Sequence, residues 1–174
     1  MSESNLKSLF EHKKKAKKEL LNKLSIKEKT PILGIILEKE INEEEEETLS
    51  HLLQGFKNTE IEVVILGDEK FKKNSHLLNY TKQNRKLLLE GSDMALSFSF
   101  NDVQEMLVNG TVPISLKRPE IKNYNPNKES GNGFVFNLMN PWSIFAASIR
   151  ALETYKFPYD WKNIVRRCLE TELV

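Results

Sequence analysis

The sequence predicts one α/β domain of three layers, a Rossmann-like parallel β-sheet with helices on both faces. Short apolar runs alternate along the chain with amphipathic segments of helical period. The apolar runs lack an alternation of apolar and polar residues, which is typical of strands buried on both faces. A chain of 174 residues, 39% of them hydrophobic, is long enough to bury such a core.

Five runs predict strands, and we expect those beginning near Pro31, Ile61, Met94 and Thr111 to form one parallel sheet. The runs are residues 31–37 (PILGIIL), 61–66 (IEVVIL), 94–98 (MALSF), 111–115 (TVPIS) and 133–136 (GFVF). Right-handed crossovers between them would place the loops after Leu37, Leu66 and Phe98 along one edge of the sheet.

Helix signals lie between the strands. Asn42 and Glu45 have the spacing of a capping box, and the run of glutamates that follows favours the start of a helix, where carboxylates complement the dipole. Asn140-Pro141 is a second start signal. The sequence predicts helices at about residues 42–56, 71–80, 82–89, 101–109, 140–155 and 159–169, and a polar loop over residues 116–132.

The N-terminal part differs from the rest in charge. Residues 1–30 hold nine Lys and four Glu, whereas residues 31–56 hold one Lys and seven Glu. Leucines at helical spacing between the lysines predict a basic amphipathic helix, or two, whose leucines dock on the domain. An alternative is a helix that binds a membrane surface or an acidic partner. We therefore divide the chain into a lead-in over residues 1–30 and a Rossmann-like domain over residues 31–174.

Several functions find no support. A net charge of +1 argues against nucleic-acid binding by bulk charge. The single cysteine, Cys168, and the three scattered histidines predict no disulfide, no metal site, no catalytic triad and no catalytic residue. The glycines form no phosphate-binding or dinucleotide motif, so no cofactor is expected. No apolar run would cross a membrane and no signal peptide is recognised, so we expect a cytoplasmic protein.

The order of the segments PILGIIL, EVVILGD, EGSDMALSFSF, MLVNGTVPIS, GNGFVFN and SIRALETYKFPYDWKNIVRRCLE resembles a known family. It is similar to the C-terminal, donor-binding domain of bacterial glycogen and starch synthases, which are two-domain GT-B glycosyltransferases. The segment HKKKAKKELLNKLSI is similar to the lead-in before that domain's first strand. The resemblance implies the Rossmann-like fold given above.

The departures from the family's pattern concern its donor site. Glu38 and Glu43 stand where the family has an Arg and a Lys that meet the diphosphate of the sugar nucleotide. The family's Glu-Pro-Cys-Gly loop is missing after residues 94–98, although Glu105 lies where the family can carry its second carboxylate. The family's Gly-Gly loop is replaced by residues 117–133, and the chain is expected to lack the N-terminal acceptor-binding domain.

Ligands of open α/β sheets bind beyond the carboxyl ends of the strands, which locates the vestigial donor site. We expect its lining to include Glu38, Lys39, Gly67, Asp68, Ser97, Ser99, Asn101, Asp102, Glu105 and Lys117. Arg118 is a further cation that could offset the carboxylates. We expect this edge to be polar, through residues such as Glu40.

Three hypotheses about function follow. The favoured one is a noncatalytic, degenerate donor domain that acts as a binding or regulatory module, with nucleotide-sugar binding doubtful. The alternative is a subunit or fragment of a glucosyltransferase, which would transfer glucose from ADP-glucose or UDP-glucose to an α-glucan and would need a separate N-terminal domain as its partner. The third is an unrelated α/β domain.

Overall fold

The computed structural model describes residues 3–27, 29–37, 41–67, 69–97 and 102–171. Its centre is a six-stranded sheet in the order β3-β2-β1-β4-β5-β6, in which every neighbouring pair is parallel. The strands are β1 Ile32–Ile36, β2 Glu62–Leu66, β3 His76–Leu78, β4 Met94–Ser97, β5 Val112–Leu116 and β6 Phe134–Phe136. The predicted Rossmann-like fold and parallel sheet are thus confirmed.

One predicted helix is wrong. Residues 71–80 were expected to be helical, but they hold the end of a short 3₁₀ helix, η1 (Glu69–Asn74), and then strand β3. Leu77 and Leu78 pair with the end of β2, and Leu78 is buried. Pairing with the open edge of the sheet therefore outweighs the local helical pattern.

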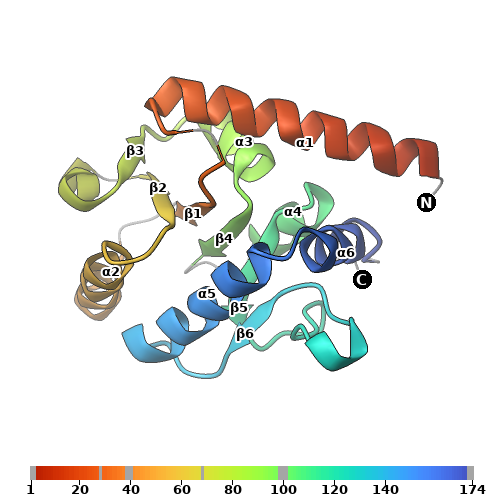
Figure 1. Cartoon of the computed structure of the whole chain (residues 1–174). Helices are drawn as coiled ribbons and strands as arrows, with labels where there is room; N and C mark the ends of the chain where they lie inside the picture. Colours follow the sequence, from red (N-terminus) through yellow and green to blue (C-terminus); the bar gives the residue numbers. More distant parts are fainter. Residues whose placement is uncertain (1–2, 28, 38–40, 68, 98–101, 172–174) are drawn as a thin grey trace.

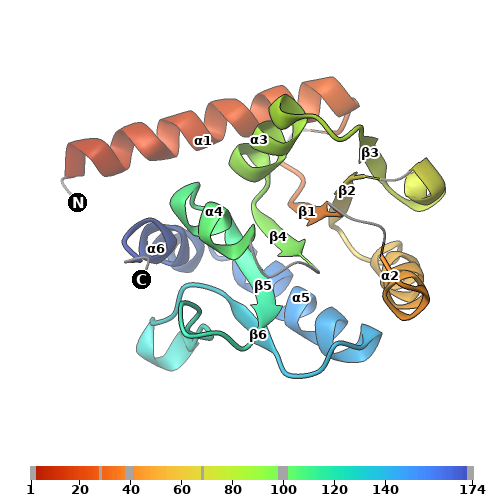
Figure 2. The same ribbon diagram turned by 180° about the vertical axis from the view of Figure 1, so that it is seen from behind.

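Helices cover both faces of the sheet, and Figures 1 and 2 show the two layers from opposite sides. On one face α2 (Glu43–Phe56) packs beside α5 (Pro141–Tyr155). On the other α1 (Glu3–Leu24) lies along α3 (Lys82–Gly91). The helices α4 (Asp102–Val108) and α6 (Pro158–Leu169) contact each other next to β5. A separate apolar core lies on each face of the sheet.

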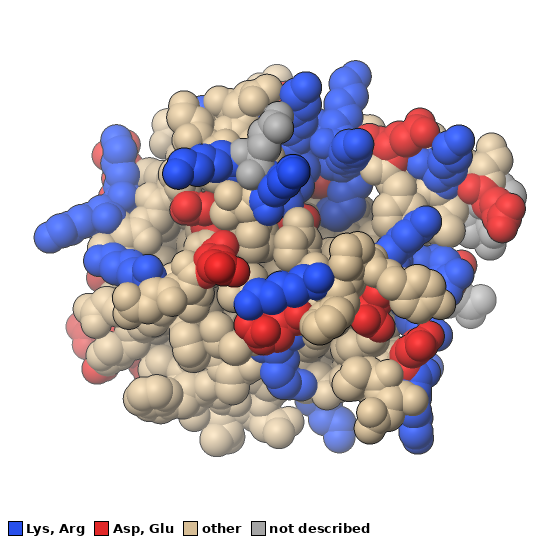
Figure 3. Space-filling view, in the orientation of Figure 1, with Lys and Arg blue, Asp and Glu red and all other residues tan. Residues whose placement is uncertain are grey.

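The basic N-terminal segment forms one helix, whose buried residues Ala16, Leu20 and Leu21 pack on the domain as expected. Its contact with α3 is close: a Cβ atom on Gly91 would lie 3.0 Å from the Ala16 carbonyl oxygen. The lysines of the opposite side face solvent. Figure 3 shows them as the blue side chains along the top of the molecule. The leucine side of α1 is therefore part of the domain's core.

Asp93 connects α1 to the amino ends of the strands. Its Oδ2 accepts hydrogen bonds from Lys17 Nζ at 2.6 Å and from the backbone N–H of Ile32 at 2.8 Å. Lys17 also donates to the Tyr155 hydroxyl at 2.9 Å. Burial alone lowers the pKa of Lys17, but the Asp93 carboxylate outweighs burial and the pKa is raised. The network joins α1, β1, β4 and α5.

Lys13 makes a second polar connection at the same edge. Its Nζ donates to the Ser92 carbonyl at 2.7 Å and to the Thr111 hydroxyl at 2.7 Å. Burial lowers the pKa of this ammonium to about 8.

Of the helices that the structure describes, none is long and apolar enough to span a bilayer.

We predict that Asp93→Ala lowers the free energy of unfolding by about 3 kcal/mol, because it leaves the Lys17 ammonium and the Ile32 N–H without this acceptor. Urea unfolding followed by circular dichroism measures the change. Glu153→Ala, which removes an ion pair with Lys156 at the surface, is the matched control and should change stability little. Equal stability of the two variants would contradict the role given to Asp93.

We also predict that Cys168 reports global unfolding. Its thiol is buried and donates to the Asn132 carbonyl, and burial raises its pKa from 9.0 to about 12. Ellman's reagent at pH 8.5 should therefore react slowly with the native protein and rapidly in guanidinium chloride. The raised pKa stabilises the fold below pH 9, and this contribution is lost between about pH 9 and 12. Rapid labelling of the native protein would contradict the burial.

Candidate functional site

The strand order reverses direction between β1 and β4, which makes the carboxyl ends of these strands the topological switch point. Ile36 pairs with Ser97 there, and both strands end at this position. Among the predicted site residues, Glu38, Lys39, Asp68, Ser99 and Asn101 lie outside the described residues.

Gly67 follows β2 at this edge and has a structural role. Its φ of 151° is unfavourable for other residues, and an added Cβ would lie 2.9 Å from the Leu37 Cβ. Its N–H donates to the Leu78 carbonyl at 3.1 Å. The glycine therefore lets the chain leave β2 close to the end of β1.

Asp102 and Glu105, at the start of α4, share one cation that the sequence had not indicated. Arg85, on α3, donates through Nη2 to the Asp102 Oδ1 at 2.7 Å and through Nη1 to the Glu105 carboxylate. The Asp102 side chain is fully buried, whereas that of Glu105 is half exposed. The ion pairs hold α3 and α4 together, and two carboxylates exceed the one guanidinium.

The start of α2, which follows β1 on the same edge, is also acidic. Asn42 Oδ1 accepts from the Glu45 N–H at 2.9 Å, and Glu45 Oε2 accepts from the Asn42 N–H at 3.0 Å, which confirms the capping box. Four glutamates, Glu43 to Glu46, occupy the first turn. The positive end of the helix dipole is therefore already complemented by the chain's own carboxylates.

Lys117 and Arg118 follow β5. Lys117 is exposed, whereas the Arg118 side chain is largely buried and its Nε lies 3.7 Å from the Glu120 Oε2. Arg118 is therefore engaged by a carboxylate of its own loop, and Lys117 is the more accessible of the two cations.

The expectation of a polar edge is met only in part. Glu38, Lys39, Glu40 and Asn101 are not among the described residues, and Asp102 is buried in its ion pair. Two large apolar side chains are exposed just beyond β6 instead. Leu138 is 63% exposed and Trp142, in the first turn of α5, is 82% exposed.

Within the described residues, no three His, Cys, Asp or Glu side chains come together to hold a metal ion. His76 Nε2 lies 3.1 Å from Glu62 Oε2. These two residues begin β3 and β2, so the pair lies at the amino ends of the strands, opposite the switch point. The described part of the switch point thus holds carboxylates at the starts of α2 and α4, of which Asp102 and Glu105 bind Arg85 and Glu46 pairs with Lys70.

No protein-family model matches the sequence. The glycogen synthase of Fervidobacterium nodosum is 26% identical over 94% of this chain and 39% of its own length. The glycogen synthase of Syntrophotalea carbinolica is 30% identical over 53% of this chain and 21% of its own length. The chain therefore spans about two fifths of the length of the first of these relatives.

Solved structures show the same fold. The catalytic domain of starch synthase IV from Arabidopsis thaliana, bound to ADP and acarbose, aligns with a TM-score of 0.73 at 17% identity, over 92% of this chain and 39% of that one. Anabaena Alr3699/HepE, in complex with UDP and glucose, aligns with a TM-score of 0.66 at 10% identity, over 90% of this chain and 47% of that one. The chain is a relative of the glycogen synthases, with a Rossmann-like GT-B glycosyltransferase fold whose extent fits their C-terminal domain.

Proposed function

We propose that this chain is a degenerate donor domain that does not bind a sugar nucleotide and works as a binding or regulatory module. The observation that carries the proposal is the acidic switch point. Four glutamates fill the first turn of α2, and Arg85 is already bound by Asp102 and Glu105.

The charges at this edge support the absence of donor binding. A sugar nucleotide brings a diphosphate with about two negative charges, which is held in proteins by Arg, Lys or backbone N–H groups. Glu38 and Glu43 replace the cations that the family has at those two positions. At the described part of this edge, a diphosphate would meet carboxylates from α2 and α4 in place of a clamp. Like charges brought together in a partly dry cleft cost several kcal/mol.

Arg85 does not repair this loss. Its contacts with Asp102 and Glu105 use both terminal nitrogens, and its side chain is largely buried between α3 and α4. Turning Arg85 towards a diphosphate would leave the fully buried Asp102 carboxylate without this partner. The free energy lost would exceed the free energy gained from a new, exposed ion pair.

A second candidate function is a fragment or subunit of an α-glucan glucosyltransferase. The observation in its favour is the exposure of Leu138 and Trp142 beside the strand edge, because in GT-B enzymes that edge faces the other domain. Lys117, exposed after β5, would then supply part of the missing charge.

We predict no heat of binding when ADP-glucose or UDP-glucose is titrated to millimolar concentration in a calorimeter. The double variant Glu38→Arg, Glu43→Lys should recover part of the binding, because it restores the two cations. Glu129→Lys with Glu170→Arg changes the net charge equally but lies elsewhere in the sequence, and serves as the control. Micromolar binding by the unmodified protein would refute the proposal and favour the glucosyltransferase fragment.

We predict that Arg85→Met lowers the free energy of unfolding by about 3 kcal/mol, since it removes this partner from the buried Asp102. The matched variant Arg166→Met removes an exposed arginine from α6 and should leave stability nearly unchanged. Urea unfolding compares the two. If Arg85 held a donor diphosphate instead, its replacement would abolish a nucleotide binding that the unmodified protein possesses.

A further inference from the structure

The helices α1 and α3 form an outer layer of the domain, and the solvent side of this layer is rich in lysine. Exposed lysines of both helices lie there, and we call this surface the lysine face. On α1 they are Lys7, Lys14, Lys15, Lys18 and Lys23, and on α3 they are Lys82 and Lys86. Figure 3 shows the lysines of α1 as blue side chains along the top of the molecule.

The lysine face is a fixed surface because the other side of α1 belongs to the core. Ala16, Leu20 and Leu21 are buried there. Two further lysines of the helix are turned inward, where Lys13 donates to the Ser92 carbonyl and Lys17 to the Asp93 carboxylate. The lysines that attach α1 to the domain are thus different from those that it exposes.

Three of the exposed lysines form a stripe along the helix. Lys14 and Lys18 follow Lys7 at spacings close to two and three full turns, so their side chains leave the same side of α1. Figures 1 and 2 show α1 as one straight helix at the outside of the molecule, and its 22 residues span about 33 Å. A flat partner could therefore contact the stripe along its whole length.

The lysine face carries more positive than negative charge. Glu3, Glu11 and Glu19 are exposed on α1 between the lysines, and Glu90 of α3 lies 3.8 Å from the Lys86 Nζ. The seven lysines exceed these four glutamates by three charges. Each lysine close to an anionic lipid surface strengthens binding about fivefold, so the surplus corresponds to about a hundredfold.

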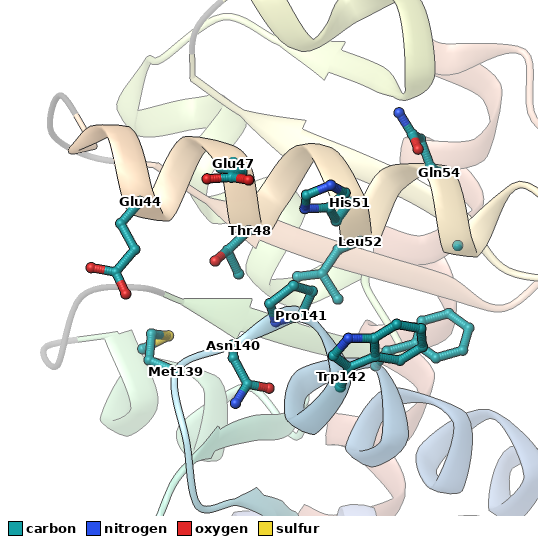
Figure 4. Close-up of a pocket in the computed structure, with 12 residues that line it drawn as sticks. Glu44, Glu47, Thr48, His51, Leu52, Gln54, Met139, Asn140, Pro141 and Trp142 are labelled. Carbon is teal, nitrogen blue, oxygen red and sulfur yellow. The ribbon is translucent and has the colours of Figure 1, made fainter.

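The helical layer on the other side of the sheet has the opposite charge. Glu43, Glu44 and Glu47 of α2 are exposed, and Figure 4 shows the last two projecting from this helix. An anionic surface would repel α2 and attract the lysine face. It would therefore hold the domain in one orientation.

The side chains of the lysine face fit a lipid surface better than a nucleic acid. The helix α1 holds lysines and no arginine, whereas arginine is the residue that reads phosphates and base edges in a bidentate way. The only Phe, Tyr or Trp of α1 is Phe10, which is partly buried with the Lys162 Nζ 5.7 Å from its ring centroid, so it offers little surface for base stacking. Lysines act as point charges, and a plane of anionic head groups requires no more than these.

We infer that the lysine face docks the domain on a membrane surface of anionic phospholipids. The attraction acts between the exposed ammonium groups and the lipid head groups, while the apolar side of α1 stays in the core and does not enter the bilayer. The inference goes beyond the proposed function, because it concerns the layer of α1 and α3 and holds whether or not the switch point binds a nucleotide.

Co-sedimentation with lipid vesicles tests the inference. In low-salt buffer, the protein should bind vesicles of phosphatidylcholine mixed with phosphatidylglycerol about a hundredfold more tightly than vesicles of phosphatidylcholine alone. High salt should release the protein, because the attraction between exposed charges is screened.

A triple variant removes the stripe. Lys7→Gln, Lys14→Gln and Lys18→Gln together cancel the surplus of positive charge, so this variant should bind the two kinds of vesicle equally weakly. Circular dichroism of the variant verifies that it is folded.

A second triple variant is the matched control. Lys72→Gln, Lys122→Gln and Lys128→Gln change the net charge equally, at exposed lysines that lie outside α1 and α3. This variant should bind anionic vesicles like the unmodified protein. For the unmodified protein, the helix signal in circular dichroism should stay the same when anionic vesicles are added, because α1 is already helical on the domain.

Four results would overturn the inference. The first is an absence of binding to the anionic vesicles, and the second is equal binding of the unmodified protein to both kinds of vesicle. The third is a stripe variant that binds like the control. The fourth is duplex DNA that binds the protein more tightly than the anionic vesicles do at the same salt, which would make a nucleic acid the partner. Sugar-nucleotide calorimetry is a separate measurement, so failure here leaves the proposal on the donor site standing.

Discussion

The Asp93 carboxylate holds together the starts of β1 and β4, the two central strands of the sheet. By accepting hydrogen bonds from Lys17 and from the Ile32 N–H, it aligns the start of β1 with the start of β4. These strands are the pair at which the sheet changes direction, so an interaction at their amino ends sets the geometry at their carboxyl ends. The ion pair also attaches α1, while Tyr155 brings in the end of α5.

Because the fold is held elsewhere, the charges at the carboxyl edge of the sheet can vary without loss of the fold. The forces that hold the sheet together are apolar burial on its two faces and the polar network at the amino edge. The carboxyl edge contributes side chains, such as Glu43 at the start of α2, that the core does not need. Glutamates at this edge cost little stability, and in α2 they complement the helix dipole.

The strands and most helices could be predicted because buried strands and amphipathic helices have distinct periods. Strand β3 could not, because three residues are too few to show a period and the segment pairs only with β2 at the edge of the sheet. The ion pairs of Arg85 could not be predicted either, because local spacing does not show that α3 and α4 pack side by side. The close approach of Phe145 to Gly55 could not be predicted for the same reason, since the two residues are far apart in sequence and only the packing of α2 on α5 brings them together.

The buried ammonium of Lys13 changes where the domain begins. The sequence suggested a border at residue 31, yet Lys13 donates to Ser92 and Thr111, which lie on the segments that enter β4 and β5. A chain cut at that border would expose the apolar side of α3 and leave these acceptors to water. The helix would therefore resist proteases and exchange its amide protons together with the central strands, as one cooperative unit rather than as a fraying terminus.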